Sequence, residues 1–327
     1  MTQHPKLTFL ALLALCLPCS SAWAWHDKGH EAATGFALAA LPDDVPAFFR
    51  EGGEVVRGAV TEPDMFTKPV APWELHAAEA QEHFFDIEFL ADGHLTLKAT
   101  RFEFLEQCYD KQIKPYRVGL APYAVMEWTH RLTIAFAQHR RWPEDKAIQQ
   151  KCLLYAGFLA HYAQDLCQPL HTSIHYDGRV AKLGDPSPRS GIHNKVDALP
   201  GKLDAKPDDV LKDLKIQPLI DRTAEPATSA TSQPATNPAR TPNPPSPLLK
   251  AILTQIEANH KLVDRVYELE KDLPGMHDPL PEDSHKVRAF ALERLRESTR
   301  FSASLLLTAW RESEFIEIPA WHRGKHE

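Results

Sequence analysis

The sequence predicts an all-α protein that forms a single multi-helix domain with long loops. Apolar residues recur at helical spacing in four long segments, residues 117–139, 146–167, 248–269 and 285–310, whereas the alternating pattern of β-strands is nearly absent. A chain of 327 residues has room for one large domain or two small ones. We expect one, because the helices near the C-terminus are too few to form a second domain.

The N-terminal residues 1–24 have the pattern of a secretory signal peptide. A positive charge at Lys6 precedes an apolar run over residues 7–17, and small residues follow up to Ala24. This run is too short to span a bilayer, and no later stretch has the roughly 20 apolar residues of a membrane helix. We therefore expect a secreted or periplasmic protein without a transmembrane segment, whose mature chain begins at Trp25.

Two short helices are expected after the leader, at residues 31–41 and 45–51, with Pro42 between them. The last long segment, residues 285–310, carries one apolar stripe and is expected to be core with no chemistry. Between residues 223 and 247 the composition changes to Pro, Ala, Thr, Ser and Asn, with seven prolines and no aromatic residue. Such a stretch cannot bury enough apolar surface to offset its ordering entropy, so we expect a flexible insertion.

Charge and cysteine content exclude some classes of protein. The formal net charge is −7, so the chain lacks the basic character of most nucleic-acid-binding domains, and a phosphate group must be attracted locally. The cysteines outside the leader are Cys108, Cys152 and Cys167. They are too few for a disulfide scaffold, although one bond among them is possible. No obligate protein partner is indicated.

The strongest candidate site lies near the end of the predicted helix at residues 146–167. His161 and Asp165 are four residues apart, so their side chains project from the same helix face. Pro169 then ends the helix and lets His171 approach from another direction. Further candidates in the same part of the chain are Asp64, His83, His193 and Asp197. One His/Asp pair alone is weak evidence, but the combination predicts a zinc site, because imidazole and carboxylate are zinc ligands.

The new N-terminus would add an unusual ligand. Signal-peptide cleavage leaves the α-amino group of Trp25 five residues before His30. An α-amino group has a pKa of about 7.7 to 8.0 and can lose its proton to a metal ion near neutral pH. The carbonyl oxygen of Trp25 can close a chelate ring, so cleavage itself would create a ligand.

Together these residues resemble the superfamily that joins the secreted single-strand-specific zinc nucleases of the 3′-nucleotidase type with the bacterial zinc-dependent phospholipases C. The likeness covers residues 25–197, with a weaker likeness at residues 297–303. It implies three zinc ions bound in one cleft. By this resemblance, one zinc is held by Asp64, His83, His161 and Asp165, the second by Trp25, His30 and Asp165, and the third by His171, His193 and Asp197.

The resemblance also implies the chemistry. Asp64 and Asp165 would take part in catalysis, because Asp165 bridges two zinc ions that hold a shared water as the attacking hydroxide. Three Zn²⁺ ions and the three ligand carboxylates leave the site cationic, which attracts phosphate. Phe84 corresponds to a phenylalanine that stacks on a nucleobase, and Lys68 lies near the place of a phosphate-binding arginine. Asp86 could accept the second imidazole N–H of a ligand histidine and so orient its ring.

Three functions follow as alternatives. The first is a nuclease or 3′-nucleotidase acting on single-stranded nucleic acid or nucleotides, favoured by the short Trp25 to His30 spacing and by aspartate at position 197. The second is a phospholipase C acting on phospholipid head groups, which would benefit from an apolar rim around the pocket. The third is a protein that binds zinc without turnover. Open coordination by His171, His193 and Asp197 favours an enzyme over this last alternative.

Overall fold

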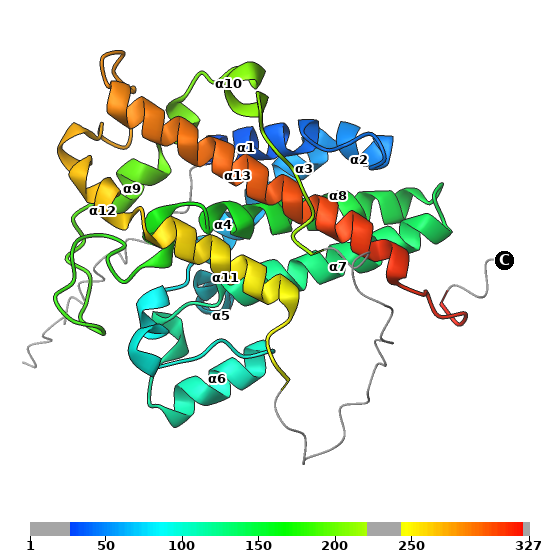
Figure 1. Ribbon diagram of the computed structural model, residues 1–327, viewed down its shortest axis with the longest axis horizontal. Helices are drawn as coiled ribbons and strands as arrows, with labels where there is room; N and C mark the ends of the chain where they lie inside the picture. Colours follow the sequence, from blue (N-terminus) through cyan, green and yellow to red (C-terminus); the bar gives the residue numbers. More distant parts are fainter. Residues whose placement is uncertain (1–26, 221–242, 323–327) are drawn as a thin grey trace, which may run out of the picture.

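The computed structural model describes residues 27–220 and 243–322 (Figure 1). Within these residues every regular element is a helix, and the all-α prediction is confirmed. The predicted leader, Trp25 and residues 223–242 of the predicted insertion lie outside the described residues. No described helix is both long enough and apolar enough to cross a membrane.

The helices before residue 142 are α1 (Asp27–Ala39), α2 (Ala47–Glu51), α3 (Gly53–Val60), α4 (Glu62–Phe66), α5 (Trp73–Glu79), α6 (Arg101–Asp110) and α7 (Ala121–Arg141). Those that follow are α8 (Lys146–Asp165), α9 (Ile192–Asp197), α10 (Pro207–Leu211), α11 (Pro247–His260), α12 (Val263–Glu268) and α13 (His285–Glu312). Two 3₁₀ turns, η1 (Ala80–His83) and η5 (Pro169–Thr172), carry candidate ligands.

The long predicted helices lie close to their expected positions. Helix α7 begins at Ala121 rather than at residue 117, with Pro122 in its first turn, where a missing N–H is harmless. The segment predicted as one helix at residues 248–269 is two helices, α11 and α12. Helix α8 begins at residue 146 as expected, because the Asp145 side chain accepts the N–H groups of Ala147 and Ile148.

Helix α8 lies at the centre of the fold and packs against α3, α7 and α13, while α1 packs against α3 and α13. Figure 1 shows α13, coloured orange to red, running across this set of helices. Large fully buried side chains join them, including Phe136 of α7, Leu159 of α8 and Phe301 of α13. Each contributes about 1.5–3 kcal/mol by leaving water, so α8 is a rigid support for the residues at its end.

Helices α3 and α8 approach each other unusually closely. A Cβ atom at Gly157 of α8 would lie 2.5 Å from Ala59 Cβ and 2.8 Å from the Ala59 carbonyl carbon. Only glycine allows this approach without displacing α3, because real Cβ atoms do not come so near to backbone. The contact brings the last residue of α3, Val60, to the side chain of His161, one turn after Gly157.

Candidate metal centre

The structure brings eight of the predicted ligands together in three buried groups. In each group the candidate ligand atoms lie within 4.8 Å of one another. The groups are His30, His161 and Asp165; Asp64, His83 and His161; and His171, His193 and Asp197. The ninth predicted ligand, Trp25, lies outside the described residues. Two groups share His161, so they adjoin as the predicted metal pair requires.

The carboxylate of Asp165 lies between the groups. Its Oδ2 is 2.9 Å from His83 Nδ1 and 3.4 Å from His161 Nε2. Its Oδ1 is 3.5 Å from His30 Nε2 on the other side. One oxygen therefore faces each of the first two groups, which is the arrangement that a bridging carboxylate needs.

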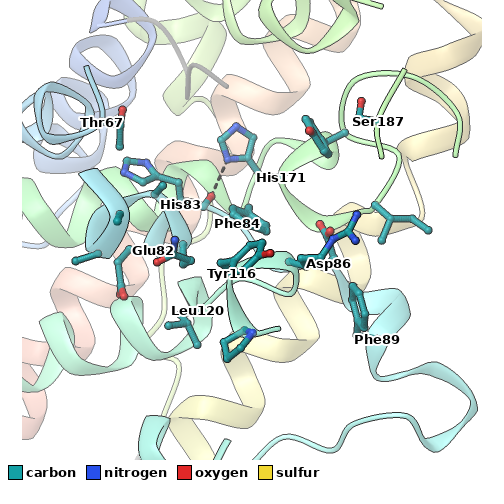
Figure 2. Close-up of a pocket in the computed structure, with 18 of the residues that line it drawn as sticks. Thr67, Glu82, His83, Phe84, Asp86, Phe89, Tyr116, Leu120, His171 and Ser187 are labelled. Carbon is teal, nitrogen blue, oxygen red and sulfur yellow. Dashed lines mark hydrogen bonds between the residues drawn. The ribbon is translucent and has the colours of Figure 1, made fainter. Parts of the chain in front are cut away.

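Four of the five histidines hold Nδ1 against a backbone carbonyl or side-chain amide oxygen. The acceptors are the carbonyl of Val60 for His161 (2.7 Å), the carbonyl of His83 for His171 (2.7 Å), the carbonyl of Tyr176 for His193 (3.1 Å) and the amide oxygen of Gln164 for His30 (2.6 Å). Figure 2 shows the bond from His171 to His83. A carbonyl oxygen can only accept, so each of these rings carries a proton on Nδ1, and in its neutral form it presents the Nε2 lone pair to its group.

Several atoms that point into the groups are buried and have no hydrogen-bond partner among the described residues. They are the Nε2 atoms of His30, His171 and His193, together with Asp165 Oδ1 and Asp197 Oδ2. A buried polar atom without a partner costs about 1–3 kcal/mol of folding stability, so five such atoms in one region would destabilise the fold strongly. A bound cation removes this cost because it accepts their lone pairs, and nitrogen and oxygen donors of this kind suit zinc.

His83 has the reverse orientation. Its Nδ1 faces Asp165 and lies 3.0 Å from His161 Nε2, whereas its Nε2 faces Glu79 Oε1 at 3.6 Å. The hydroxyl of Tyr162 donates to the same carboxylate of Glu79. Glu79, which no sequence pattern indicated, therefore lies where it can orient His83, the role considered for Asp86 from the sequence.

Burial and neighbouring charges set the proton affinities of the groups. Burial by itself lowers the pKa of His83, but the hydrogen bond to Asp165 and the nearby carboxylate of Glu79 raise it to about 10. Burial also lowers the pKa of His171, but the carboxylates of Asp165 and Asp197 raise it to about 9. His161 has a pKa well below the usual value because it is buried beside His30 and His83. Protons and a metal cation would therefore compete for His83 and His171.

A cleft of about 1090 Å³ opens beside the ligands and is lined by His83, His171 and His193. Its mouth carries three aromatic side chains from different elements. Trp73 of α5 is 74% exposed, Tyr109 of α6 is 69% exposed and Tyr116 is 55% exposed. The cleft thus combines a polar, histidine-rich floor with an aromatic rim.

Phe84 lines this cleft next to His83 (Figure 2). Its carbonyl accepts the N–H of Ala121, and the next N–H, of Phe85, donates to the carbonyl of His171. Gly119 permits this arrangement, because its φ is +86° and a Cβ there would lie 2.0 Å from the Phe84 carbonyl oxygen and 2.8 Å from the Phe84 ring. The placement is compatible with the predicted stacking role, which stays a prediction.

Asp86 and Lys68 differ in their relation to the cleft. Asp86 lines it, is 6% exposed, and has no partner for Oδ1 among the described residues. Burial and then the charge of Glu88 raise its pKa well above the usual value. Lys68 is not among the lining residues, although its charge lowers the pKa of Asp64, which burial raises. The substrate contact predicted for Lys68 therefore has no support from its position.

The remaining unexpected residues are two glutamines. Gln164 lies in the last turn of α8 and Gln168 directly before η5, and both are fully buried beside the ligand groups. Two glutamines four apart, each close in sequence to a ligand candidate, were the signal available in the sequence. That signal was weak, because glutamine is common on helix surfaces and only burial marks these two as special.

Comparison with known proteins returned one structural likeness. No protein-family model and no curated protein matches the chain. Among solved structures, the crystal structure of the alpha-toxin from an avian strain of Clostridium perfringens is similar, with a TM-score of 0.39 and 14% identity. The match covers 92% of this chain and 66% of the alpha-toxin chain. A likeness at this level carries no argument about activity. Any inference about activity must be drawn from the site itself.

Proposed function

We propose that this chain is a zinc-dependent phosphoric ester hydrolase with three zinc ions. The observation that carries the proposal is the convergence of buried ring nitrogens and carboxylate oxygens without other partners beside a large cleft. The third group offers only three described protein ligands, and an open position of this kind is typical of catalytic zinc rather than of closed, cysteine-rich structural sites.

The nine ligands are assigned as the resemblance implies. Asp64, His83, His161 and Asp165 would hold one ion; Trp25, His30 and Asp165 the second; and His171, His193 and Asp197 the third. Bound zinc would supply Lewis acidity and a water nucleophile at neutral pH. Three Zn²⁺ ions bring +6 and the carboxylates of Asp64, Asp165 and Asp197 bring −3, so the floor of the cleft attracts a phosphate group although the chain is acidic.

The protein's own part is to hold these ligands in place. Asp165 fixes the spacing of the first two groups through its two oxygens. The bond from His171 Nδ1 to the His83 carbonyl fixes the third group relative to them. The phosphate ester would enter from the cleft, which is lined by His83, His171 and His193.

Phospholipid is the substrate class that the cleft supports best. The exposed rings of Trp73, Tyr109 and Tyr116 form the aromatic rim that a lipid substrate needs, since such rings prefer the boundary between apolar and aqueous phases. The net charge of −7 disfavours long-range attraction of nucleic acid. We therefore propose the reaction of a phospholipase C. The protein that carries it out would be secreted or periplasmic.

A nuclease or 3′-nucleotidase is the second candidate, and a specific observation favours it. Phe84 offers a ring in the cleft, and Asp86 offers a buried oxygen without a partner among the described residues. A nucleobase could stack on the first and donate a hydrogen bond to the second.

The test uses protein that begins at Trp25. Zinc content is measured together with hydrolysis of phosphatidylcholine vesicles, single-stranded DNA, a nucleoside 3′-monophosphate and bis(p-nitrophenyl) phosphate. About three zinc ions per chain with turnover of phosphatidylcholine is the expected result. Turnover of the nucleic-acid substrates alone would select the second candidate. Zinc without any turnover would indicate a binding protein, and absence of zinc would refute the proposal.

A further inference from the structure

Gln164 lies in the last turn of α8 and Gln168 lies four residues later, directly before η5, and each contacts a different ligand group. Both side chains are 0% exposed. Gln164 is hydrogen-bonded to His30, a ligand candidate of the first metal pair. Gln168 is hydrogen-bonded to Asp197, a ligand candidate of the third zinc. The end of α8 and the start of η5 are therefore each joined by a glutamine to a separate part of the proposed centre.

The orientation of Gln168 is determined by the backbone. Its Oε1 accepts the N–H of Leu170 at 2.5 Å, and because that N–H can only donate, the other end of the amide must be the NH₂ group. Gln168 Nε2 then donates to Asp197 Oδ1 at 2.7 Å. The second oxygen, Asp197 Oδ2, has no hydrogen bond among the described residues and lies 3.1 Å from His193 Nε2. Gln168 thus binds Asp197 Oδ1, which also lies 3.6 Å from His171 Nε2, and leaves Oδ2 directed at the group without a hydrogen bond.

Gln164 faces its ligand candidate with the amide oxygen, whereas Gln168 does so with the NH₂ group. Its Nε2 donates to Thr34 Oγ1 at 2.9 Å, and its Oε1 lies 2.6 Å from His30 Nδ1. An acceptor at this position keeps the proton of His30 on Nδ1. His30 Nε2 is then free of a proton and faces the group that contains Asp165.

We propose that Gln164 and Gln168 are positioning residues of opposite polarity: Gln164 is the hydrogen-bond acceptor that fixes the tautomer of His30, and Gln168 is the donor that orients the carboxylate of Asp197 toward the third group. The inference rests on the proposed zinc centre and deepens it. It has an unusual consequence, because the same substitution four residues apart should have different effects. Glutamate has the shape of glutamine but no NH₂ group, so it keeps the acceptor and loses the donor.

The test compares Gln164→Glu with Gln168→Glu in the chain that begins at Trp25. In Gln164→Glu, a carboxylate oxygen still accepts from His30, and Thr34 can donate its hydroxyl, so all zinc should be retained. In Gln168→Glu, a carboxylate oxygen faces Asp197 and repels it, so the third zinc should bind about 10- to 100-fold more weakly, the range typical of lost orienting partners. Zinc per chain is measured after dialysis against graded concentrations of a chelator.

Two further variants and one further measurement keep the outcome decisive. Gln164→Met and Gln168→Met remove both hydrogen-bonding ends with little change of volume, so each should lose one zinc selectively, even if Gln168→Glu does not fold. Thermal unfolding of the zinc-free proteins shows any purely structural effect. Equal zinc affinity in wild type, Gln168→Glu and Gln168→Met would overturn the proposal, as would equal losses in the two Glu variants. Wild-type protein without zinc would instead refute the metal centre itself.

Discussion

The close contact between α3 and α8 predicts that Gly157→Ala will weaken zinc binding more than it weakens the fold. The new Cβ would lie 2.5 Å from Ala59 Cβ, so α3 must move by about 1 Å to restore an ordinary contact of about 3.5 Å. The bond from His161 Nδ1 to the Val60 carbonyl, now 2.7 Å, would lengthen beyond hydrogen-bonding distance. His161 would then lose the partner that fixes its tautomer.

The two effects of this substitution can be compared in size. Overpacking costs about 1–3 kcal/mol, but replacing glycine by alanine inside a helix returns about 1 kcal/mol. The net loss of folding stability is therefore about 0–2 kcal/mol, whereas loss of an orienting partner weakens metal binding by about 10- to 100-fold. Zinc should be lost from the groups that share His161 under conditions where the zinc-free protein remains folded.

The assay is zinc content against chelator concentration, with thermal unfolding of the zinc-free protein measured in parallel. Gly58→Ala is the matched control, because Gly58 is a glycine of α3 where an added Cβ would meet no described atom within 4 Å. That variant should keep wild-type zinc affinity and gain about 0.5–1 kcal/mol. Wild-type zinc affinity in Gly157→Ala would refute the argument that this close approach positions His161.

Three further predictions concern the ligands themselves. Asp165→Asn should reduce both zinc content and hydrolysis more than Asp197→Asn, because Asp165 lies between two groups; equal losses would argue against bridging. One extra residue before Trp25 should remove the zinc held by the α-amino group while circular dichroism stays helical, and full zinc content would contradict the N-terminal ligand. Zinc binding at pH 8 should release about two protons, because without a cation His83 with a pKa of about 10 and His171 with a pKa of about 9 are both largely protonated. Affinity should accordingly rise with pH toward this range, and calorimetry in buffers of different ionisation enthalpy would show the release; a value near zero would exclude this competition.

Most of the helices that could be predicted had a long repeating pattern, and the two short ones at residues 31–41 and 45–51, seen as α1 and α2, were indicated by the Pro42 that separates them. Helices α7, α8 and α13 bury one face over many turns, and this face is visible in the sequence as periodic apolar residues. Helices α4 and α5 have five and seven residues and had no such pattern. Helices this short are marginal by themselves and form because the tertiary structure packs them.

The ligand candidates were accessible from the sequence because part of the site is local. The spacing of His161 and Asp165, repeated by His193 and Asp197, places two side chains on one helix face whatever the rest of the fold does. The sequence by itself therefore determined the all-α class and indicated the histidines and aspartates that converge.

Only the tertiary structure decided which atom of each side chain faces its group. The proton of His161 is placed by a carbonyl 101 residues away, and that of His171 by a carbonyl 88 residues away. Packing also brings Gln164, Gln168 and Glu79 each against a particular atom of a ligand candidate. A hydrogen bond depends on distances of a few tenths of an ångström, and such distances follow from how helices pack, which spacing along a chain does not specify.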